Sequence, residues 1–412
     1  MEYGCIGEKL THSFSKEIHN SFAEYEYELC EIPRGELDRF AKNADFKAIN
    51  VTIPYKELIM PYLDEIDSAA KSTGAVNTVV NRDGALCGYN TDFYGMKSLI
   101  SREGIDVSGK KVAILGTGGT SKTALAVANY LGAKKIIRVS RDGNEDAVKY
   151  EDLYKKHADA EVIINTTPSG MYPKIFDTPV DLSKFHSLTG VIDAIYNPLR
   201  SRLILSAHKR GIKAAGGLYM LVAQAVRASE IFLDRQYGED TLEKVYRKIL
   251  SDKENIVLIG MPSSGKSTVG QILAKTMNRE LYDTDTVIEE HEGCSISDIF
   301  KNKGEAYFRE VEADVIRDMS SKNGVIISTG GGVPLREENV DSLKMNGKLY
   351  FIDRPLENLI PTDSRPLTST REAVEKKFRE RYGIYIGAMD RRIDANCAAE
   401  EVANKIERDF TL

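Results

Sequence analysis

One short segment limits the folds open to this chain more than any other. The sequence GMPSSGKS at residues 260–267 matches the pattern G-x-x-x-x-G-K-[ST], between a predicted strand at Ile256–Ile259 and a predicted helix at Lys266–Met277. In this context the backbone N–H groups of the loop bind phosphates, the lysine reaches the outer phosphates, and the serine hydroxyl binds Mg²⁺. We therefore expect an α/β domain with a parallel sheet that binds ATP or GTP. The alternative is a chance match.

A second glycine-rich segment lies earlier in the chain. The sequence GTGGTS at residues 116–121 follows a predicted strand, Lys111–Leu115, and opens a predicted helix, Thr120–Leu131. The first glycine permits a tight turn, the second lets the backbone approach a pyrophosphate, and the helix N-terminus attracts the phosphates. This predicts a Rossmann domain that binds a dinucleotide. The alternative is a glycine-rich turn without a ligand.

The residues after the next predicted strand, Lys135–Val139, indicate which dinucleotide is bound. They read Ser140-Arg141-Asp142. An arginine at this place suits the 2′-phosphate of NADP, whereas an acid suits the free 2′-hydroxyl of NAD. Arg141 therefore favours NADP, and Asp142 favours NAD. Arg141 could also be an ordinary surface charge.

The rest of the chain alternates strand and helix patterns, which predicts an α/β protein. Two strands at 78–81 and 85–89 flank a hairpin turn, and Asp92 is expected to cap the helix that follows. The polar segment YGEDTLEKVYRKILSDK at 237–253 is the predicted linker, although part of it could be helical. The predicted domains are an α/β substrate domain at 1–103, to which a helix at about 217–235 returns, a Rossmann domain at 104–236 and a phosphate-loop domain at 254–412.

Composition excludes several classes of protein. The 412 residues carry a net charge of −6, so no basic surface for nucleic acid is expected. No apolar run reaches the length of a membrane span, and the first residues, MEYG, do not resemble a signal peptide. The five cysteines contain no C-x-x-C pair and the six histidines no H-E-x-x-H motif. We therefore expect reduced thiols, no structural metal and a cytoplasmic location. The oligomeric state stays open.

Several motifs, in order, resemble those of shikimate dehydrogenase over about the first 235 residues. They are SFS at 13–15, NVTIPYKE at 50–57, GAVNT at 74–78, NTD at 90–92 and GLYMLVAQA at 217–225. Each motif alone has an ordinary structural explanation, such as a surface lysine or a turn serine, but together they favour the resemblance. It implies reduction of 3-dehydroshikimate with NADPH.

The resemblance also implies roles for residues. Lys56 would donate a proton to the developing alkoxide, and Asp92 would orient Lys56. The residues expected to bind substrate are Ser13, Ser15, Thr52, Asn77, Gln224 and, near the nicotinamide, Tyr196, with Asn50 supporting the pocket. Those expected to bind the cofactor are Gly116, Gly118, Gly119, Thr120, Ser140, Arg141 and Gly217. Glu145 stands where the family often has a further basic residue, which weakens the NADP prediction.

From about Asn255 to the end, the sequence resembles shikimate kinase. The matching motifs are DTD at 283–285, FR at 308–309 with Glu312, GGG at 330–332, RPL at 365–367 and Arg381 with Tyr385. Two departures stand out. Ser263 replaces a glycine in the phosphate loop, and Asn358 occupies a position, seven residues before Arg365, where the family has an arginine.

This second resemblance implies phosphorylation of shikimate with MgATP. Lys266 and the lid residue Arg365 would neutralise the phosphates, which Gly260, Ser263, Ser264, Gly265, Ser267 and Thr268 would also bind. Ser267 would bind Mg²⁺ directly and Asp283 through water, unless Asp283 is merely a helix cap. Asp285 would accept the hydroxyl proton. The substrate carboxylate would pair with Arg309 and Arg381, although Arg381 could be one charge of a basic helix, and Gly331 and Gly332 would approach the ring.

Together the two resemblances imply a fusion of two consecutive steps of the shikimate pathway, with small-molecule substrates and the cofactors NADP(H), ATP and Mg²⁺. The shikimate made in the first step would be phosphorylated in the second. One alternative is a quinate-type dehydrogenase joined to a kinase for another small metabolite. The other is a protein in which one half is degenerate and acts as a regulatory module.

Overall fold

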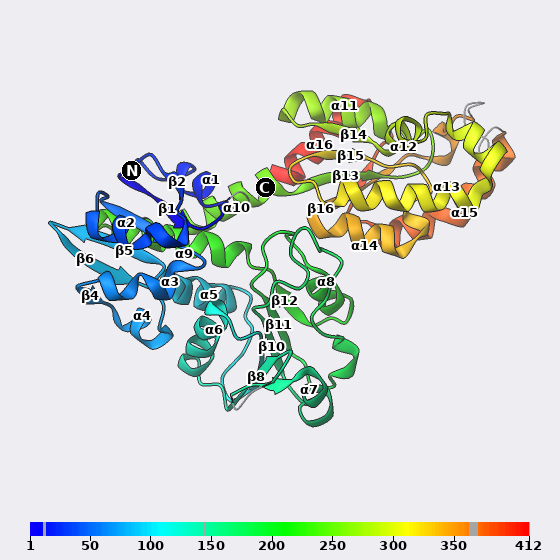
Figure 1. The fold of residues 1–412 in the computed structure, drawn as a ribbon. Coiled ribbons are helices and arrows are strands. Elements are labelled where there is room, and N and C mark those ends of the chain that lie inside the picture. The colour runs from blue at the N-terminus through cyan, green and yellow to red at the C-terminus, as the bar shows by residue number, and fades with distance from the viewer. Residues whose placement is uncertain (11–13, 144–145, 362–369, 412) are drawn as a thin grey trace. The chain divides into compact units, whose positions relative to one another are not determined.

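The computed structural model describes residues 1–10, 14–143, 146–361 and 370–411. They divide into two units, Met1–Ile249 and Leu250–Leu412 (Figure 1). Each unit combines helices with sheets whose strands are mostly or entirely parallel, which confirms the predicted α/β class. None of the helices in these ranges combines the length and apolar character needed to cross a membrane.

The N-terminal part of the first unit is built on a mixed sheet. Its strands, in spatial order, are β2 (Glu28–Glu31), β1 (Tyr3–Gly7), β3 (Ala48–Val51), β5 (Thr78–Arg82), β6 (Ala85–Tyr89) and β4 (Glu65–Ile66). Its helices are α1 (Ser15–Asn20), η1 (Arg34–Glu36), α2 (Leu37–Asn43), α3 (Tyr55–Leu58), η2 (Met60–Tyr62), α4 (Ser68–Thr73) and α5 (Thr91–Arg102). The antiparallel pair β5–β6 confirms the predicted hairpin. Its turn residues, Asp83 and Gly84, both have positive φ (53° and 97°), as tight hairpin turns require.

The second sheet of this unit is entirely parallel. Its strands, in spatial order, are β12 (Lys213–Ala215), β11 (Gly190–Asp193), β10 (Val162–Asn165), β7 (Lys111–Leu115), β8 (Lys135–Ser140) and β9 (Val148–Lys149). Its helices are α6 (Gly119–Tyr130), α7 (Tyr150–Lys156), η3 (Leu182–Lys184), α8 (Arg202–Lys209) and α9 (Leu218–Leu233). The central strands β7, β10 and β11 are buried along almost their whole length, as expected where helices cover both faces of a parallel sheet.

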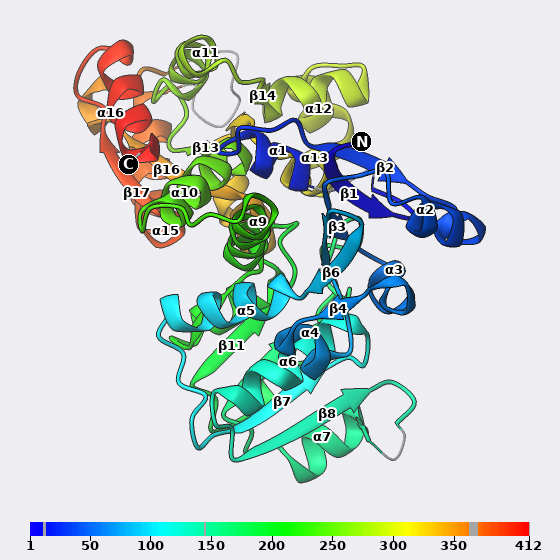
Figure 2. The same ribbon diagram turned by 90° about the vertical axis from the view of Figure 1, so that its left-hand side faces the viewer.

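Helices α5 and α9 pack side by side and connect the two sheets of the first unit (Figure 2). Met96 and Leu99 of α5 and Met220 of α9 belong to the core cluster that covers one face of the parallel sheet. At the other end of α9, Ala228 and Phe232 pack with residues of the mixed sheet. The two helices therefore carry side chains to the region where the substrate and cofactor parts meet.

The segment predicted as a linker contains helix α10 (Thr241–Lys253). Val245 and Ile249 are buried. The guanidinium of Arg102, at the end of α5, donates from Nη2 to Glu243 at 3.1 Å. It also lies over the rings of Tyr219 and Tyr246, 4.7 and 4.6 Å from their centroids. Most of α10 is thus an element of the first unit rather than a free tether.

The last turn of α10 belongs to the second unit. The N–H of Gly324 donates to the carbonyl of Lys253 at 2.9 Å. Arg279 donates to the carbonyl of Glu254 at 2.7 Å and also to the carbonyl of Ser251. Glu254, which is buried, is the one residue between α10 and the next strand, β13 (Asn255–Ile259).

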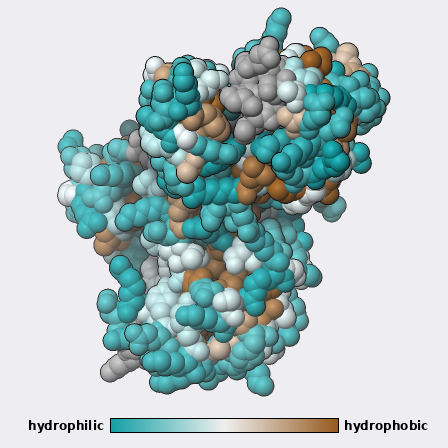
Figure 3. Space-filling model, turned by 90° about the vertical axis from the view of Figure 1, so that its right-hand side faces the viewer, coloured by the Kyte–Doolittle hydropathy of each residue, from teal (hydrophilic) through white to brown (hydrophobic). Residues whose placement is uncertain are grey.

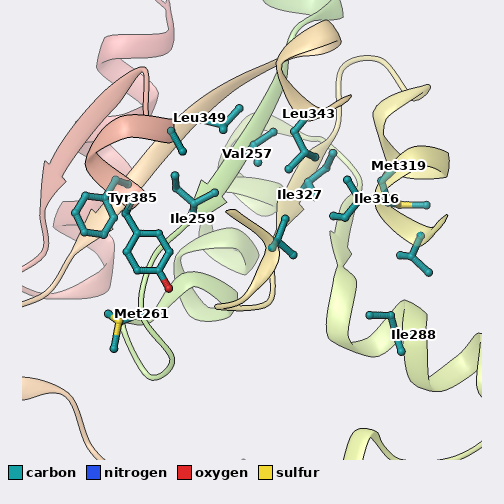
Figure 4. Packing of buried hydrophobic residues seen from close by; sticks show 14 of the residues in the cluster. Val257, Ile259, Met261, Ile288, Ile316, Met319, Ile327, Leu343, Leu349 and Tyr385 are labelled. Carbon is teal, nitrogen blue, oxygen red and sulfur yellow. The ribbon is translucent and has the colours of Figure 1, made fainter. Parts of the chain in front are cut away.

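The second unit has one parallel sheet. Its strands, in spatial order, are β14 (Leu281–Asp283), β15 (Ile326–Ser328), β13, β16 (Gly347–Asp353) and β17 (Arg391–Asp394). Its helices are α11 (Lys266–Met277), α12 (Thr284–Glu292), α13 (Ile296–Ser320), η4 (Val333–Leu335), α14 (Glu337–Asn346), η5 (Leu356–Asn358), α15 (Arg371–Ala388) and α16 (Ala399–Thr411). One core cluster joins Val257 and Ile259 to Ile316, Ile327 and Tyr385 (Figure 4). The other face of the sheet packs on α11 and α16.

One face of the molecule is mainly polar. Figure 3 shows a face on which most residues are hydrophilic and the hydrophobic ones lie in small patches. This agrees with the composition, in which 29% of residues are charged. Scattered apolar residues of this kind are normal on a folded chain and need no special explanation.

Candidate active sites

An ion pair marks the centre of the first site. The Nζ atom of Lys56, in α3, donates to Oδ2 of Asp92, in α5, at 2.5 Å. Both side chains are largely buried, with 21% and 14% of their surfaces exposed. The prediction that Asp92 caps its helix is wrong, because the side chain of Asn90 accepts the N–H of Phe93 and caps α5. The carboxylate of Asp92 is therefore available to orient the lysine.

A network of buried amides and hydroxyls lies beside this pair. Asn77 donates from Nδ2 to the hydroxyl of Thr91 at 3.0 Å and accepts the N–H of Thr91 at 2.7 Å. The Oε1 atom of Gln224, in α9, lies 3.4 Å from the hydroxyl of Thr91. The fold thus brings together Asn77 and Gln224, which are far apart in the chain. Thr91 contacts both; it stands in the NTD motif at 90–92, but the sequence predicts no role for it.

Asn50 connects this network to the mixed sheet. Its Oδ1 accepts the hydroxyl of Tyr27 at 2.7 Å, and its Nδ2 donates to the carbonyl of Asn77 and to the hydroxyl of Thr78 at 3.2 and 3.1 Å. All four residues are buried. Because every polar atom of the Asn50 amide is bonded, its position is well determined.

Four residues expected to bind substrate remain, and the structure describes three of them. Thr52 follows β3 and is half-buried, as is Ser15 at the start of α1. Ser13 lies outside the described residues. The ring of Phe14 packs on that of Tyr196 at 5.2 Å, so the start of α1 contacts the residue expected beside the nicotinamide. Burial raises the pKa of the Tyr196 hydroxyl, which stays protonated at neutral pH.

The loop between β7 and α6 has the features of a phosphate site. Gly116 has a φ of 103°, and a Cβ there would lie 2.8 Å from the hydroxyl of Thr166. Gly118 caps α6 without any side-chain hydrogen bond, and a Cβ on Gly118 or Gly119 would meet nothing within 4 Å. Thr120 lies in the first turn of α6. The backbone of this loop is therefore open to a pyrophosphate.

Ser140 ends β8, the strand beside β7, and its hydroxyl accepts the N–H of Gly143 at 3.0 Å. Arg141 follows and is exposed. Glu145 lies outside the described residues. Gly217 immediately precedes α9, and its Cα packs so closely on the carbonyl of Ala194 that a side chain could not fit. This close approach lets α9 begin at the carboxyl edge of the parallel sheet.

A buried carboxylate at this edge was not expected from the sequence. Asp193, at the end of β11, accepts hydrogen bonds from Ser201 at 2.5 Å, from Asn165 at 2.9 Å and from the N–H of Ile195 at 3.1 Å. Burial raises the pKa of Asp193 to about 6, although the three hydrogen bonds oppose this. These bonds hold the segment that carries Tyr196. The signal in the sequence is a polar residue, Asn165 or Asp193, at the end of each of two otherwise apolar strands.

In the second site, the phosphate loop has the backbone that the motif requires. Gly260 and Gly265 have φ values of 150° and 95°. The Nζ atom of Lys266 is buried and donates to the carbonyls of Gly260 and Met261 at 3.0 and 2.8 Å. Thr268 is exposed in the first turn of α11, and Ser264 is buried. The lysine is thus already held inside the loop.

Ser263 adopts a left-handed conformation, with φ of 64°. This conformation costs a residue with a side chain roughly 1–2 kcal/mol, whereas glycine adopts it freely. Glycine also gives the unfolded chain more conformational entropy than serine does, and this offsets part of the roughly 1–2 kcal/mol.

We expect Ser263→Gly to raise the free energy of unfolding of the second unit by up to about 1 kcal/mol. Urea denaturation of the full chain measures this. Ser264→Gly is the matched control and should destabilise, because Ser264 is buried and its φ is not positive. A loss of stability in Ser263→Gly would mean that the serine makes a stabilising contact that outweighs its strain.

Two hydroxyls and a carboxylate meet beside the loop. Ser267 and Ser328 donate to Oδ2 of Asp283 at 2.7 and 3.0 Å, and Oδ1 of Asp283 accepts the N–H of Asp285 and caps α12. Asp283 is therefore both a helix cap and a partner of the loop serine. These hard oxygen atoms suit Mg²⁺, which proteins bind through few side chains together with phosphates. The described residues contain no group of three or more His, Cys, Asp or Glu side chains that could hold a metal alone.

A group of arginines and glycines adjoins the phosphate loop, since a Cβ on Gly331 would lie 2.8 Å from Pro262. Arg381 is buried and donates to the carbonyl of Gly331 at 3.0 Å, which the hydroxyl of Tyr385 also reaches at 2.6 Å. A Cβ on Gly330 would lie 2.5 Å from Asp285, and one on Gly332 would overlap the guanidinium of Arg309. These glycines leave room for the side chains that the sequence predicts around the substrate.

Glu312 holds Arg309 in this position. Nη1 of Arg309 donates to both carboxylate oxygens of Glu312, at 3.0 and 2.8 Å, and Nη2 donates to Glu305 at 3.1 Å. Glu312 is buried, and burial raises its pKa, although Arg309 opposes this. The sequence motif contained Glu312, but its role as the anchor of Arg309 is visible only in the fold. The lid residue Arg365 lies outside the described residues.

Comparisons with known families find a separate match in each of the two units. The family model described as shikimate kinase matches residues 262–411, and the one described as shikimate dehydrogenase substrate binding domain matches residues 5–79. The shikimate dehydrogenase (NADP⁺) of Clostridium beijerinckii is 38% identical over 261 residues, which covers 59% of this chain and 96% of that protein.

Two solved structures resemble the same part of the chain. Shikimate dehydrogenase 1 from Peptoclostridium difficile is 38% identical, with a TM-score of 0.55, and the match covers 60% of this chain and 98% of that one. A chorismate mutase/shikimate 5-dehydrogenase fusion protein from Clostridium acetobutylicum is 34% identical, with a TM-score of 0.56, over 60% of this chain and 96% of that one.

Proposed function

Because the chain belongs to the shikimate dehydrogenase family over its N-terminal 60% and carries a shikimate kinase domain at residues 262–411, we propose that it catalyses two consecutive reactions. The first unit reduces 3-dehydroshikimate to shikimate with NADPH. The second unit phosphorylates the 3-hydroxyl of shikimate with MgATP. The chain is thus a bifunctional enzyme of the shikimate pathway, and its substrates are small molecules.

The observation that supports this proposal most strongly is that each unit holds its own set of reacting groups. The first has Lys56 against Asp92 beside a network that ends at Gln224. The second has the phosphate loop, the Ser267–Asp283 pair and, two residues further along the chain, Asp285 near Gly330. Neither set needs a residue from the other unit, which argues against a degenerate half.

In the reduction, Lys56 supplies the proton. Bound NADPH supplies the hydride, and the open backbone at Gly118 and Gly119 with Arg141 would hold it. As the ketone is reduced, negative charge develops on its oxygen, and the Lys56 ammonium can donate a proton there. Asp92 keeps Nζ pointed at that oxygen. The amide and hydroxyl groups around Asn77 and Gln224 would bind the substrate hydroxyls.

In the phosphorylation, the chain positions the acceptor and balances charge. ATP with Mg²⁺, held by the phosphate loop and by Ser267 and Asp283, supplies the phosphoryl group. Arg309 and Arg381 would pair with the carboxylate of shikimate, for which arginine has suitable geometry. Asp285 would then accept the proton of the attacking hydroxyl. Lys266 would offset the charge of the outer phosphates.

Two separate assays on the purified chain test the proposal. One follows NADPH oxidation with 3-dehydroshikimate, and the other follows ADP release with shikimate and ATP. Both activities are expected. If quinate turned over faster than shikimate in the reverse direction of the first assay, the substrate assignment would be wrong. If correctly folded protein showed one of the two activities and not the other, the unit without activity would be degenerate.

Arg141→Ala should reduce the preference for NADPH. Its guanidinium would bind the 2′-phosphate, and a charged hydrogen bond contributes about 1.5–3 kcal/mol, so kcat/KM for NADPH should fall about 10- to 100-fold. The value for NADH should change little. Lys155→Ala, an exposed cation of the same domain paired with Glu151, is the control. If the ratio of kcat/KM for NADPH to that for NADH were unchanged in Arg141→Ala, a group other than Arg141 would bind the 2′-phosphate.

A further inference from the structure

An arginine that no motif singled out lies against the phosphate loop of the second unit. Arg354 directly follows β16, the parallel neighbour of β13. Its Nη1 atom lies 3.8 Å from where a Cβ on Gly265 would be. Gly265 is the residue from which α11 begins. The guanidinium therefore lies at the carboxyl edge of the sheet, where α/β proteins bind their ligands.

The side chain of Arg354 has no partner within the described chain. Its Nε atom is buried and makes no hydrogen bond to the described residues, and none of their carboxylates forms an ion pair with its guanidinium. The adjacent carboxylate, Asp353, is already bonded to Arg392 and to the hydroxyl of Tyr382, at 2.6 and 3.0 Å. An arginine is normally satisfied when it is this enclosed, because an unpaired buried donor is unfavourable.

The electrostatic surroundings make this placement more unusual. The N-terminus of a helix carries partial positive charge, and Gly265 stands at that end of α11. Lys266, the next residue, is a second cation. A cation placed beside such a terminus is unfavourable until an anion joins it. The arrangement is therefore suited to a ligand that brings negative charge to this place.

We propose that Arg354 binds the phosphate chain of the nucleotide beside Gly265, as a positioning residue for phosphoryl transfer. This inference rests on the proposed kinase function, because it takes ATP as the anion. It also accounts for a departure in the sequence. Asn358, where the related kinases carry an arginine, donates to Asn396 at 3.0 Å and brings no charge. Arg354 supplies a cation from an earlier position in the same segment.

Titration calorimetry with ADP and AMP on the full chain tests the proposal. Arg354→Met should weaken ADP binding about 10- to 100-fold, the range expected for a lost hydrogen bond to a charged group. Binding of AMP should weaken less, because AMP lacks the β-phosphate. Arg354→Lys should recover part of the loss. Arg317→Met, which removes an exposed arginine paired with Asp314 on α13, is the control and should bind ADP normally.

Thermal unfolding without nucleotide separates this role from a structural one. If Arg354 pairs with bound phosphate and not with the protein, Arg354→Met without nucleotide should be at least as stable as the wild type, because the substitution removes an unpaired charge. Unchanged ADP affinity, equal loss for ADP and AMP, or a lower melting temperature without nucleotide would each overturn the proposal. If the wild type itself neither bound ADP nor phosphorylated shikimate, the proposed kinase function would fail instead.

Discussion

Lys56→Ala should lower the kcat for reduction of 3-dehydroshikimate by about 10²- to 10⁴-fold, the usual contribution of a general acid. The Nζ atom of Lys56 lies 2.5 Å from Asp92, and its side chain is largely buried. Water could replace it as a proton donor only poorly, since it would not be held in place. Phosphorylation of shikimate by the same preparation should be unchanged, which provides an internal control for the enzyme concentration and for the folding of the second unit.

Lys47→Ala is the matched control for this prediction. Lys47 is an exposed lysine of the same unit that pairs with Glu2 at 2.9 Å, so its removal changes the charge equally without touching the site. It should reduce 3-dehydroshikimate at the wild-type rate. Near-normal kcat in Lys56→Ala would exclude Lys56 as the proton donor. A rise in KM with kcat preserved would instead give it a role in binding only.

Asp285→Asn should lower the kcat for phosphorylation by a similar factor, about 10²- to 10⁴-fold. The amide keeps the shape of the carboxylate but cannot accept the hydroxyl proton. Asp285 lies next to Gly330. Because the hydroxyl is activated only if its proton can leave toward Asp285, kcat should fall while the affinity for ADP changes little. A coupled assay of ADP release measures the first and calorimetry the second.

The control here is Asp314→Asn, an exposed carboxylate of the same unit paired with Arg317. It should phosphorylate shikimate normally. If Asp285→Asn kept a kcat within a few-fold of the wild type, proton removal would not depend on this carboxylate. If it lost ADP binding as well, Asp285 would act on the nucleotide site rather than on the acceptor.

Local sequence patterns predicted the elements that need only neighbouring residues. The helix after the phosphate loop has the predicted bounds, Lys266–Met277, because a glycine with positive φ begins it and the left-handed Asn278 ends it. The hairpin at Asp83 and Gly84 was likewise predicted from its turn residues. The strands around both glycine loops follow from short apolar runs between such signals.

Features that depend on residues far apart in the sequence could not be predicted from local patterns. Asn90 rather than Asp92 caps α5, and the choice reflects the pairing of Asp92 with Lys56 from another element. The segment 237–253 looked like a linker because its composition is polar. Residues 241–253 form helix α10, on which Arg102 of α5 pairs with Glu243 and Tyr219 of α9 packs on Tyr246.

The same limit applies to the candidate sites. The motifs named Asn77 and Gln224, but nothing in the sequence indicated that Thr91 would lie between them. Arg354 belongs to no motif and attracts attention only because the fold places it next to Gly265, where no described residue pairs with it. Residues whose function comes from what packs against them require the structure.

The junction between the two units has a consequence for metabolic flux. Helix α10 leads into β13 through a single buried residue, Glu254, so one polypeptide carries both sets of groups without an exposed loop at the joint. A protease finds exposed loops more readily than such a joint. The two catalysts are consequently made and kept at a one-to-one ratio at every level of expression. A cell that needs to balance the two steps cannot adjust their relative amounts. Any matching of their rates has to be achieved within the active sites themselves.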